Sequence, residues 1–340
     1  MDHPDRPAVA VVIAAHDAEP TLARAIRSAL LQPETSEVLV VDDASNDGTL
    51  RLAEAEAERD KRVRVIAFAQ NAGPAAARNA AFDAAEADIA AILDSDDVFL
   101  PGRLGRLLSG PPAEITADNI AFVADDALET ASAALSSPEG GPRFESLTTA
   151  EFVRGNLART GMARGELGFL KPILSLPFLR THGLRYDETL RLAEDYDLYV
   201  RMMLAGARFS VTRCPGYLAV IRPGSLSARH GTDDLARLLR VVERHMATDD
   251  LPGELSDAIR ALRDEVRAKH EHRAFLDLRR TDGARAALRY AIGGRRRGAR
   301  IARGILRDKL NLSGDAGAVA NGAEVRLLLE ATTGDAPQGR

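Results

Sequence analysis

Three acidic side chains follow one apolar run within four residues. Asp94, Asp96 and Asp97 come directly after residues 89–93, a run typical of a buried strand. Carboxylates crowded in this way repel one another unless a cation or hydrogen-bond donors compensate their charge. Carboxylate oxygens are also the ligands that Mg²⁺ and Mn²⁺ prefer. We therefore predict that Asp94 and Asp96 hold Mn²⁺ or Mg²⁺, whose other ligands would include phosphate oxygens of a bound substrate.

An acid-x-acid pair is weak support by itself. The chain has 50 Asp and Glu among 340 residues, so such pairs are expected by chance about seven times. Position makes this pair informative, because a second apolar run, residues 38–41, also ends in two acids, Asp42 and Asp43. Helix caps and turns made by Asp and Ser remain the alternative interpretation of these sites.

The acids fall at the ends of predicted strands that alternate with predicted helices. Continuous apolar runs are typical of strands covered on both faces, and the stretches between them have helical periodicity. The alternation predicts an α/β fold, a Rossmann-like, mostly parallel sheet flanked by helices. Ligands bind such sheets beyond the carboxyl ends of the strands. The predicted strands are residues 9–13, 38–41, 63–66 and 89–93, and the predicted helices are residues 19–31, 48–60 and 74–84.

Two common phosphate-binding patterns are missing. The turn after the first predicted strand reads AAHDAEP, without the G-x-G-x-x-G of a dinucleotide-binding fold. The pattern G-x-x-x-x-G-K-[ST] does not occur either. A diphosphate in this crevice would therefore lack a glycine-rich cradle, and a divalent cation is the predicted substitute.

Another acidic pair, Glu194 and Asp195, stands at the predicted first turn of a helix. The apolar residues within 198–203 form one stripe at helical spacing. Carboxylates in a first turn are usually caps that the helix dipole favours. By spacing alone, this is the preferred interpretation of the pair.

Several motifs in order resemble one family. VVIAAHDAEPTLARAIRSALLQ, VLVVDDASNDGT, NAGPAAARNAA and ILDSDDVFLP, from about residue 8 to 102, resemble the nucleotide-binding half of the family 2 glycosyltransferases, which use the GT-A fold. The family's usual proline and aromatic residue are Ala15 and His16 here. The resemblance implies that Asp43 accepts a hydrogen bond from uracil and that Asp96 is the metal ligand. The implied nucleotide-sugar-binding residues are Ala15, His16, Glu19, Asp43, Arg78, Asp94 and Ser95, and Asp94 joins Asp96 at the metal.

The resemblance continues in the second half of the chain. Residues 168–206 are similar to the family's Glu-Asp motif before a helix, which implies that Asp195, beside Glu194, is the catalytic base of an inverting transfer. The segment GYLAVIRPGSLSARH resembles a loop in which Arg222 closes over the diphosphate, although an ordinary turn fits equally well. GFLKPILSLPFLRTHGLRYDE further resembles glucosyltransferases of succinoglycan-type exopolysaccharide assembly. That likeness implies a UDP-glucose donor and a glycan or polyprenyl-diphosphate-linked oligosaccharide acceptor.

The predicted organisation has two parts. Residues 1–232 form a GT-A domain, with a nucleotide-sugar-binding half, 1–102, and an acceptor and catalytic half, 103–232. Residues 233–340 form a mainly helical C-terminal region. Within the catalytic half, residues 130–146 are rich in small residues, Pro and Gly, and we expect a surface loop there.

Charge and composition indicate the surroundings of the chain. Residues 285–309 contain nine Arg or Lys and one Asp, a net charge of +8 in a chain of net charge −5. Such a segment indicates an anionic partner, lipid or nucleic acid, or simply a solvated helix face. With a lipid-linked acceptor implied, we expect peripheral contact with an anionic membrane and no nucleic acid. One cysteine, Cys214, and no signal-like start predict a cytoplasmic protein, peripheral at the inner membrane face.

Two other functions remain open at this stage. A sugar-phosphate nucleotidyltransferase would also bind a nucleotide and a metal on an α/β sheet, but it would normally carry a glycine-rich loop and a lysine after the first strand. A non-catalytic nucleotide-sugar-binding protein would keep the crevice and lose the base, whereas Asp195 is present.

Overall fold

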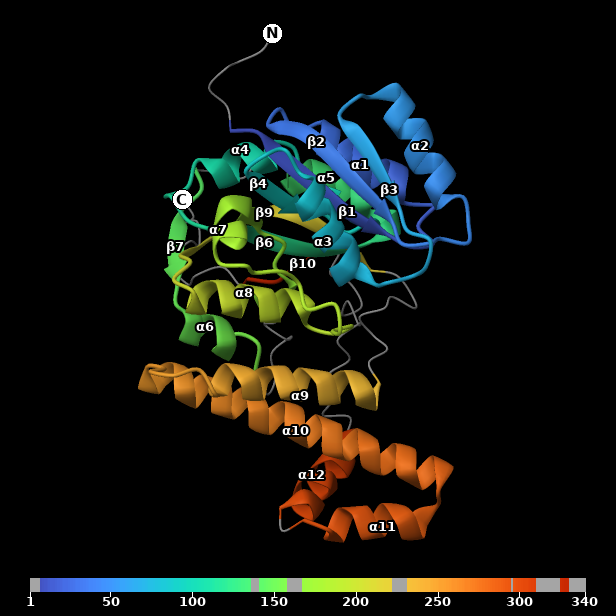
Figure 1. Ribbon diagram of the computed structural model, residues 1–340, viewed down its shortest axis with the longest axis vertical. Coiled ribbons are helices and arrows are strands. Elements are labelled where there is room, and N and C mark those ends of the chain that lie inside the picture. Colours follow the sequence, from blue (N-terminus) through green and yellow to red (C-terminus); the bar gives the residue numbers. More distant parts are fainter. Residues whose placement is uncertain are drawn as a thin grey trace, which may run out of the picture.

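The computed structural model describes residues 7–135, 141–157, 167–221, 231–294, 296–309 and 325–329. A twisted, mostly parallel sheet with helices on both faces forms the upper part in Figure 1, and a layer of long helices lies beneath it. The sheet order is β3-β2-β1-β4-β8-β6-β9-β5, with β10 beside β6 and β7 beside β9. The predicted α/β architecture is therefore confirmed.

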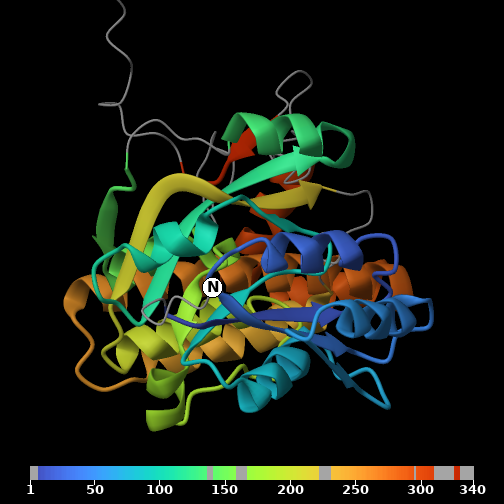
Figure 2. The same ribbon diagram turned by 90° about the horizontal axis from the view of Figure 1, so that it is seen from above.

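The first four strands are the predicted ones, and all pair in parallel. Their apolar runs are buried because helices cover both faces of the sheet. The chain order reverses between β1 and β4, so right-handed crossovers place α1 and α2 on one face and α3 on the other (Figure 2). The elements are β1 (Val9–Ala15), α1 (Leu22–Leu30), β2 (Thr35–Asp42), α2 (Thr49–Arg59), β3 (Val63–Ala67), α3 (Pro74–Ala84) and β4 (Ile89–Ile92).

The second half extends the same sheet with mixed strand directions. Strand β8 is antiparallel to both β4 and β6, whereas the long β9 curves alongside β6 in parallel (Figure 2). The strands are β5 (Val98–Phe99), β6 (Ile115–Ala124), β7 (Phe144–Leu147), β8 (Ile173–Ser175) and β9 (Phe209–Ile221). The helices are α4 (Arg103–Leu108), α5 (Leu128–Leu135), α6 (Thr149–Arg154), α7 (Leu176–Thr181) and α8 (Glu194–Leu204), with short 3-10 turns at Asp125–Ala127 and Leu167–Phe169.

The prediction of a loop over residues 130–146 is wrong at both ends of that range. Helix α5 includes residues up to Leu135 because Leu128 and Ala131 pack into a small apolar cluster with Val220. Strand β7 pairs with the first half of β9. Without β7, the backbone N–H and C=O groups along that edge of β9 would lack partners in the sheet. Small residues and glycine dominate this stretch, so its composition concealed both elements.

Among the described residues, four helices follow β9, which confirms the predicted helical C-terminal region. They are α9 (Thr232–Met246), α10 (Gly253–Thr281), α11 (Ala284–Ile292) and α12 (Arg297–Lys309). Leu255, Ile259, Leu262 and Val266 form the buried stripe of α10, which packs against α9 and α6. The hairpin of α11 and α12 lies at the end of the molecule farthest from the sheet (Figure 1).

One strand after the helices was not predicted. β10 (Val325–Leu327) returns to the sheet and pairs antiparallel with residues 121–123 of β6. The side-chain amide of Asn119 donates to the carbonyl oxygen of Leu329 at 2.8 Å and accepts from its N–H at 2.8 Å. Within the described ranges, no helix is both long and apolar enough to cross a membrane.

Candidate active site

Asp43, at the end of β2, holds the start of α3. Its buried carboxylate accepts hydrogen bonds from the backbone N–H groups of Ala72 at 2.6 Å and Gly73 at 2.8 Å. Gly73 has φ +91°, a conformation that glycine adopts without steric cost. These bonds compensate the charge of Asp43 and fix the position of α3, whose fifth residue is Arg78.

Other predicted nucleotide-binding residues gather around Asp43. Its backbone N–H donates to Ala15 O at 2.8 Å, and its carbonyl oxygen lies 2.9 Å from His16 Nδ1. The side-chain amide of Asn71 donates to the same carbonyl oxygen at 3.2 Å. Glu19 accepts from the N–H of Gly48 at 3.0 Å, at the turn before α2. The structure thus brings Ala15, His16, Glu19 and Asp43 to one edge of the sheet.

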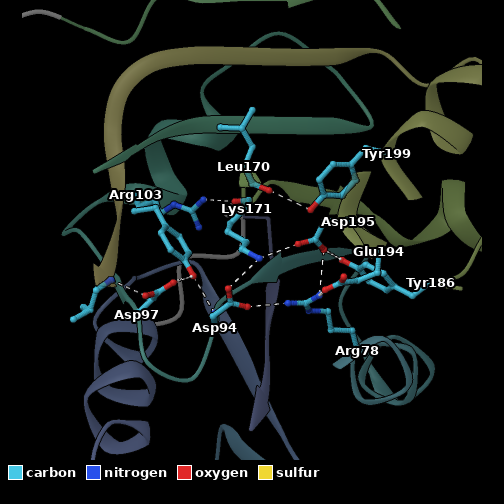
Figure 3. Close-up of polar contacts among 12 residues, drawn as sticks. Arg78, Asp94, Asp97, Arg103, Leu170, Lys171, Tyr186, Glu194, Asp195 and Tyr199 are labelled. Atoms are coloured by element: carbon cyan, nitrogen blue, oxygen red, sulfur yellow. Dashed lines mark hydrogen bonds and ion pairs between the residues drawn. The ribbon is translucent and has the colours of Figure 1, made fainter. Parts of the chain in front are cut away.

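Arg78 joins the two predicted acidic motifs (Figure 3). Its guanidinium donates to Asp94 Oδ1 at 2.8 Å, to Glu194 Oε1 at 3.0 Å and to Asp195 Oδ1 at 3.2 Å. Burial alone would lower the pKa of Arg78, but its acidic neighbours, Asp195 first, raise it well above the ordinary value. Residues that lie 16 and 117 positions away in the chain therefore meet at one side chain.

Lys171 makes a second link between the same two acids. Its Nζ lies 2.8 Å from Asp195 Oδ2 and 3.0 Å from Asp94 Oδ2. Asp94, Arg78, Asp195 and Lys171 therefore form a closed ring of alternating charges, which we call the four-charge ring (Figure 3). Desolvation would raise the pKa of Asp94, but Lys171 and Arg78 lower it to about 2. Neither Lys171 nor Tyr186, whose hydroxyl group also contacts Asp195, was predicted as a site residue.

Helix α8 presents Asp195 from its first turn, as predicted. Ala193, directly before the helix, has φ +60°, so the chain turns sharply into it. The Tyr186 hydroxyl donates to Asp195 Oδ1 at 2.9 Å. Two residues after Asp195, the buried Asp197 accepts from Arg201 at 2.8 Å and lies 2.9 Å from His245 Nε2 of α9. The C-terminal helices thus anchor the helix that carries the predicted base.

Asp97 differs from Asp94 although they share one turn. Its carboxylate accepts from the Tyr217 hydroxyl at 2.8 Å and from the N–H of Val220 at 2.9 Å. Burial, followed by the nearby charges of Asp94 and Asp96, raises the pKa of Asp97 well above its ordinary value. Ser95 and Asp96, between them, are half-buried.

The residues on this turn fit a divalent cation only together with a substrate. Within the described residues, no group of three or more His, Cys, Asp or Glu is arranged to hold a metal by itself. Mg²⁺ is commonly bound by one or two carboxylates plus substrate phosphates. Asp96 suits that arrangement, and Asp94 adjoins it although Arg78 and Lys171 engage both of its oxygens. The predicted Arg222 lies outside the described residues.

Comparison with known proteins gives the class. Residues 10–124 match the model of the glycosyl transferase family 2. The chain belongs to this family, is a glycosyltransferase and has the GT-A fold. Two solved structures support the fold. The chain superposes on Staphylococcus aureus TarS 1-349 in complex with UDP-GlcNAc, with TM-score 0.54 and 21% identity over 81% of this chain and 74% of that one. The mannosyltransferase PcManGT from Pyrobaculum calidifontis, in complex with GDP-Man and Mn²⁺, gives TM-score 0.55 and 16% identity over 92% and 84%.

Two relatives are proteins of succinoglycan biosynthesis. The succinoglycan biosynthesis protein ExoU of Rhizobium meliloti is 42% identical over 335 residues, 97% of each chain. ExoO of the same organism is 37% identical over 278 residues, 80% of this chain and 76% of its own. The similarity to ExoU thus includes the C-terminal helices as well as the sheet.

Proposed function

We propose that this protein is an inverting, metal-dependent glycosyltransferase that transfers glucose from UDP-glucose to a hydroxyl of a glycan acceptor in bacterial exopolysaccharide biosynthesis. The observation that carries the proposal is the link between Asp94 and Asp195 through Arg78 and Lys171. It joins the predicted donor-side acid to the predicted base within one cluster. The succinoglycan relatives support the pathway. A polyprenyl-diphosphate-linked oligosaccharide is the proposed acceptor.

Asp195 is the proposed general base. It takes the proton of the acceptor hydroxyl as that oxygen attacks the anomeric carbon and the UDP oxygen leaves from the opposite side. A single displacement of this kind inverts the anomeric centre. Arg78, buried and held beside Asp94, offers positive charge to the departing diphosphate. Asp96, with Asp94 adjoining, would hold Mn²⁺ or Mg²⁺, which supplies further positive charge beside the diphosphate.

The reaction products test this proposal against its two rivals. Purified protein is incubated with Mn²⁺, UDP-glucose and a lipid-linked oligosaccharide, and the products are separated. A glycan lengthened by one glucose, with inverted configuration by NMR, together with UDP supports the proposal. In a separate incubation with UTP and glucose 1-phosphate, release of pyrophosphate would instead identify a nucleotidyltransferase. Tight binding of UDP-glucose without turnover by any acceptor would identify a binding protein.

We further propose that the hairpin of α11 and α12 contacts an anionic membrane. Residues 284–307 contain no Asp or Glu. On α11, Arg285, Leu288, Arg289 and Ile292 are exposed at spacings that place them on one face, with Leu288 at 61% and Ile292 at 73% exposure. Leu306 on α12 is 57% exposed. Arginines interleaved with exposed aliphatic side chains suit the headgroup region of anionic lipid.

Sedimentation with vesicles tests this membrane contact. The full chain is expected to sediment with phosphatidylglycerol vesicles and not with phosphatidylcholine vesicles. Leu288→Glu is expected to weaken the sedimentation, because it places a carboxylate on the face that meets the lipid. Leu31→Glu is the matched control, since Leu31 is 74% exposed but follows α1, outside the hairpin. Equal losses in the two variants would contradict the proposal.

A further inference from the structure

Lys171 performs no step in the mechanism proposed above, yet it is buried between Asp94 and Asp195 of the four-charge ring. It precedes β8, the strand between β4 and β6. Burial would lower the pKa of Lys171, but its acidic neighbours, Asp195 and then Asp94, raise it. Burying an ammonium group is costly unless it is paired, and here two carboxylates pair with it.

The two oxygens of Asp195 are not equivalent. Oδ1 accepts from both Arg78 and Tyr186, whereas Oδ2 accepts from Lys171. A carboxylate has about four lone-pair positions, two on each oxygen. Counting donors from the described residues alone, Oδ1 is saturated and Oδ2 keeps one position. An acceptor hydroxyl that gives its proton to Asp195 would therefore give it to Oδ2.

We propose that Lys171 is the positioning residue of the base: it holds Oδ2 of Asp195 toward the acceptor hydroxyl and ties that orientation to the donor side through Asp94. This inference rests on the proposed function. The proton passes from the acceptor hydroxyl to Oδ2 of Asp195, and the acceptor oxygen forms the new bond to the anomeric carbon. UDP leaves with the electron pair of the broken bond between the anomeric carbon and the diphosphate oxygen. Lys171 keeps its own protons throughout.

The geometry of the four-charge ring favours lysine over arginine at residue 171. One Nζ atom reaches both carboxylates, at 2.8 and 3.0 Å, and its three donors rotate about a single point. A guanidinium is planar and spreads its donors over a fork, so arginine would meet the two carboxylates in a different geometry. Arginine at residue 171 would keep the charge and shift the carboxylate. A displacement of about 1 Å in such a site costs about 100-fold in rate, so a smaller shift of the carboxylate by arginine is expected to cost less.

The test compares Lys171→Met and Lys171→Arg in the full chain, with kcat, acceptor KM and UDP-glucose affinity measured separately. Lys171→Met is expected to lower kcat about 100-fold and to change donor affinity less than about fivefold. Lys171→Arg is expected to recover about tenfold of that loss. In the Asp195→Asn background, Lys171→Met is expected to lower the residual rate no further, because both changes disable the same group.

Different outcomes overturn the inference. A purely structural lysine would lower the rate by the same factor in both backgrounds, or lower donor affinity as much as kcat. Lys269→Met, which removes an ion pair on α10, controls for the loss of a paired lysine and is expected to keep wild-type kcat. If Lys171→Met does not fold, Lys171→Arg decides: an unchanged Tm with about tenfold lower kcat supports the inference, and wild-type kcat refutes it.

The Asp195→Asn variant separates this inference from the proposed function. If Asp195→Asn transfers glucose at the wild-type rate, Asp195 is not the base and the proposed mechanism fails. If Asp195→Asn is inactive while Lys171→Met has wild-type kcat, the proposed function stands and only the role of Lys171 is lost.

Discussion

The four-charge ring and the hairpin of α11 and α12 use charge in opposite ways. In the ring, each of the two cations lies within 3.2 Å of both acids, and the group is largely enclosed by protein. On the hairpin, Arg285, Arg289, Arg296 and Arg303 are exposed along a stretch without any acid. Buried charges need partners inside the fold, whereas exposed charges of one sign are available to a partner outside it. The ring therefore suits chemistry and the hairpin suits recognition.

Removal of the proposed base should produce the largest effect. Asp195→Asn keeps the shape of the side chain but cannot take a proton at neutral pH, so kcat for transfer is expected to fall about 1,000-fold or more. UDP-glucose affinity by calorimetry should stay within a few-fold of wild type. Asp83→Asn, which breaks an exposed ion pair with Arg185, is the control and should leave kcat unchanged. Transfer by Asp195→Asn at the wild-type rate would contradict the view that the four-charge ring serves catalysis.

A buried charge pair next to the ring should matter for stability. Asp197→Asn leaves Arg201 without its carboxylate and weakens the link to His245, so it should lower the free energy of unfolding by about 3 kcal/mol. Burial opposes ionisation of Asp197, but His245 and Arg201 lower its pKa below 3.8. A lowered pKa contributes stability above pH 3.8 that is lost as the pH falls further.

Urea denaturation at pH 7 and at pH 3 measures both effects for Asp197. The difference between wild type and Asp197→Asn should be largest at pH 7 and smaller at pH 3, since protonation of Asp197 removes the same interactions. A difference that grows toward acidic pH would contradict the direction of the pKa shift.

Charge reversal on the hairpin should act on binding alone. Arg289→Glu is expected to weaken binding to anionic vesicles by about 2 kcal/mol, because each basic residue near such a surface contributes about 1 kcal/mol and the substitution replaces attraction by repulsion. Transfer to a soluble acceptor analogue should stay at the wild-type rate. The vesicle effect should shrink as salt concentration rises. A lower rate with the soluble analogue would show that the hairpin and the ring are not independent.

The smallest effect is expected at Asp97. Its neighbours are neutral donors rather than cations, and burial raises its pKa. A raised pKa favours folding below the ordinary value of 3.8 and opposes it as the pH rises through the shifted value. Asp97→Asn should therefore change stability at pH 7 by less than about 1 kcal/mol, or increase it. A loss as large as that of Asp197→Asn would show that Asp97 is paired like the members of the ring.

The strands and the strand-end acids could be predicted because they follow local patterns. Residues 74–84 were predicted as a helix and form α3 over the same range, and Glu194 and Asp195 were correctly placed in the first turn of α8. The predicted repulsion among strand-end acids was real, but backbone N–H groups compensate Asp43, and Arg78 and Lys171 compensate Asp94. Sequence reasoning left both a cation and hydrogen-bond donors open for that role and favoured a divalent metal.

Other parts depend on distant contacts that no local pattern contains. Lys171 is 77 residues from Asp94 in the chain, and although the segment around it carries a family resemblance, no local pattern shows that Lys171 meets Asp94. Its cluster could have been suspected only because a lysine inside an apolar segment needs a partner. Strand β10 pairs with β6, which lies some 200 residues earlier in the chain. Its sequence is so short that its strand signal is no stronger than that of many loop segments.

Strand β10 has a consequence for the hairpin. The chain enters the hairpin from α10, which packs on α6, and after α12 it rejoins the sheet at β6. The hairpin therefore lies between two parts of the chain that pack in the body of the protein, α10 and β10, and it is not a terminal tail. If the hairpin contacts a bilayer, its packing on α10, which in turn packs on α6, limits how far the catalytic edge can tilt away from that bilayer.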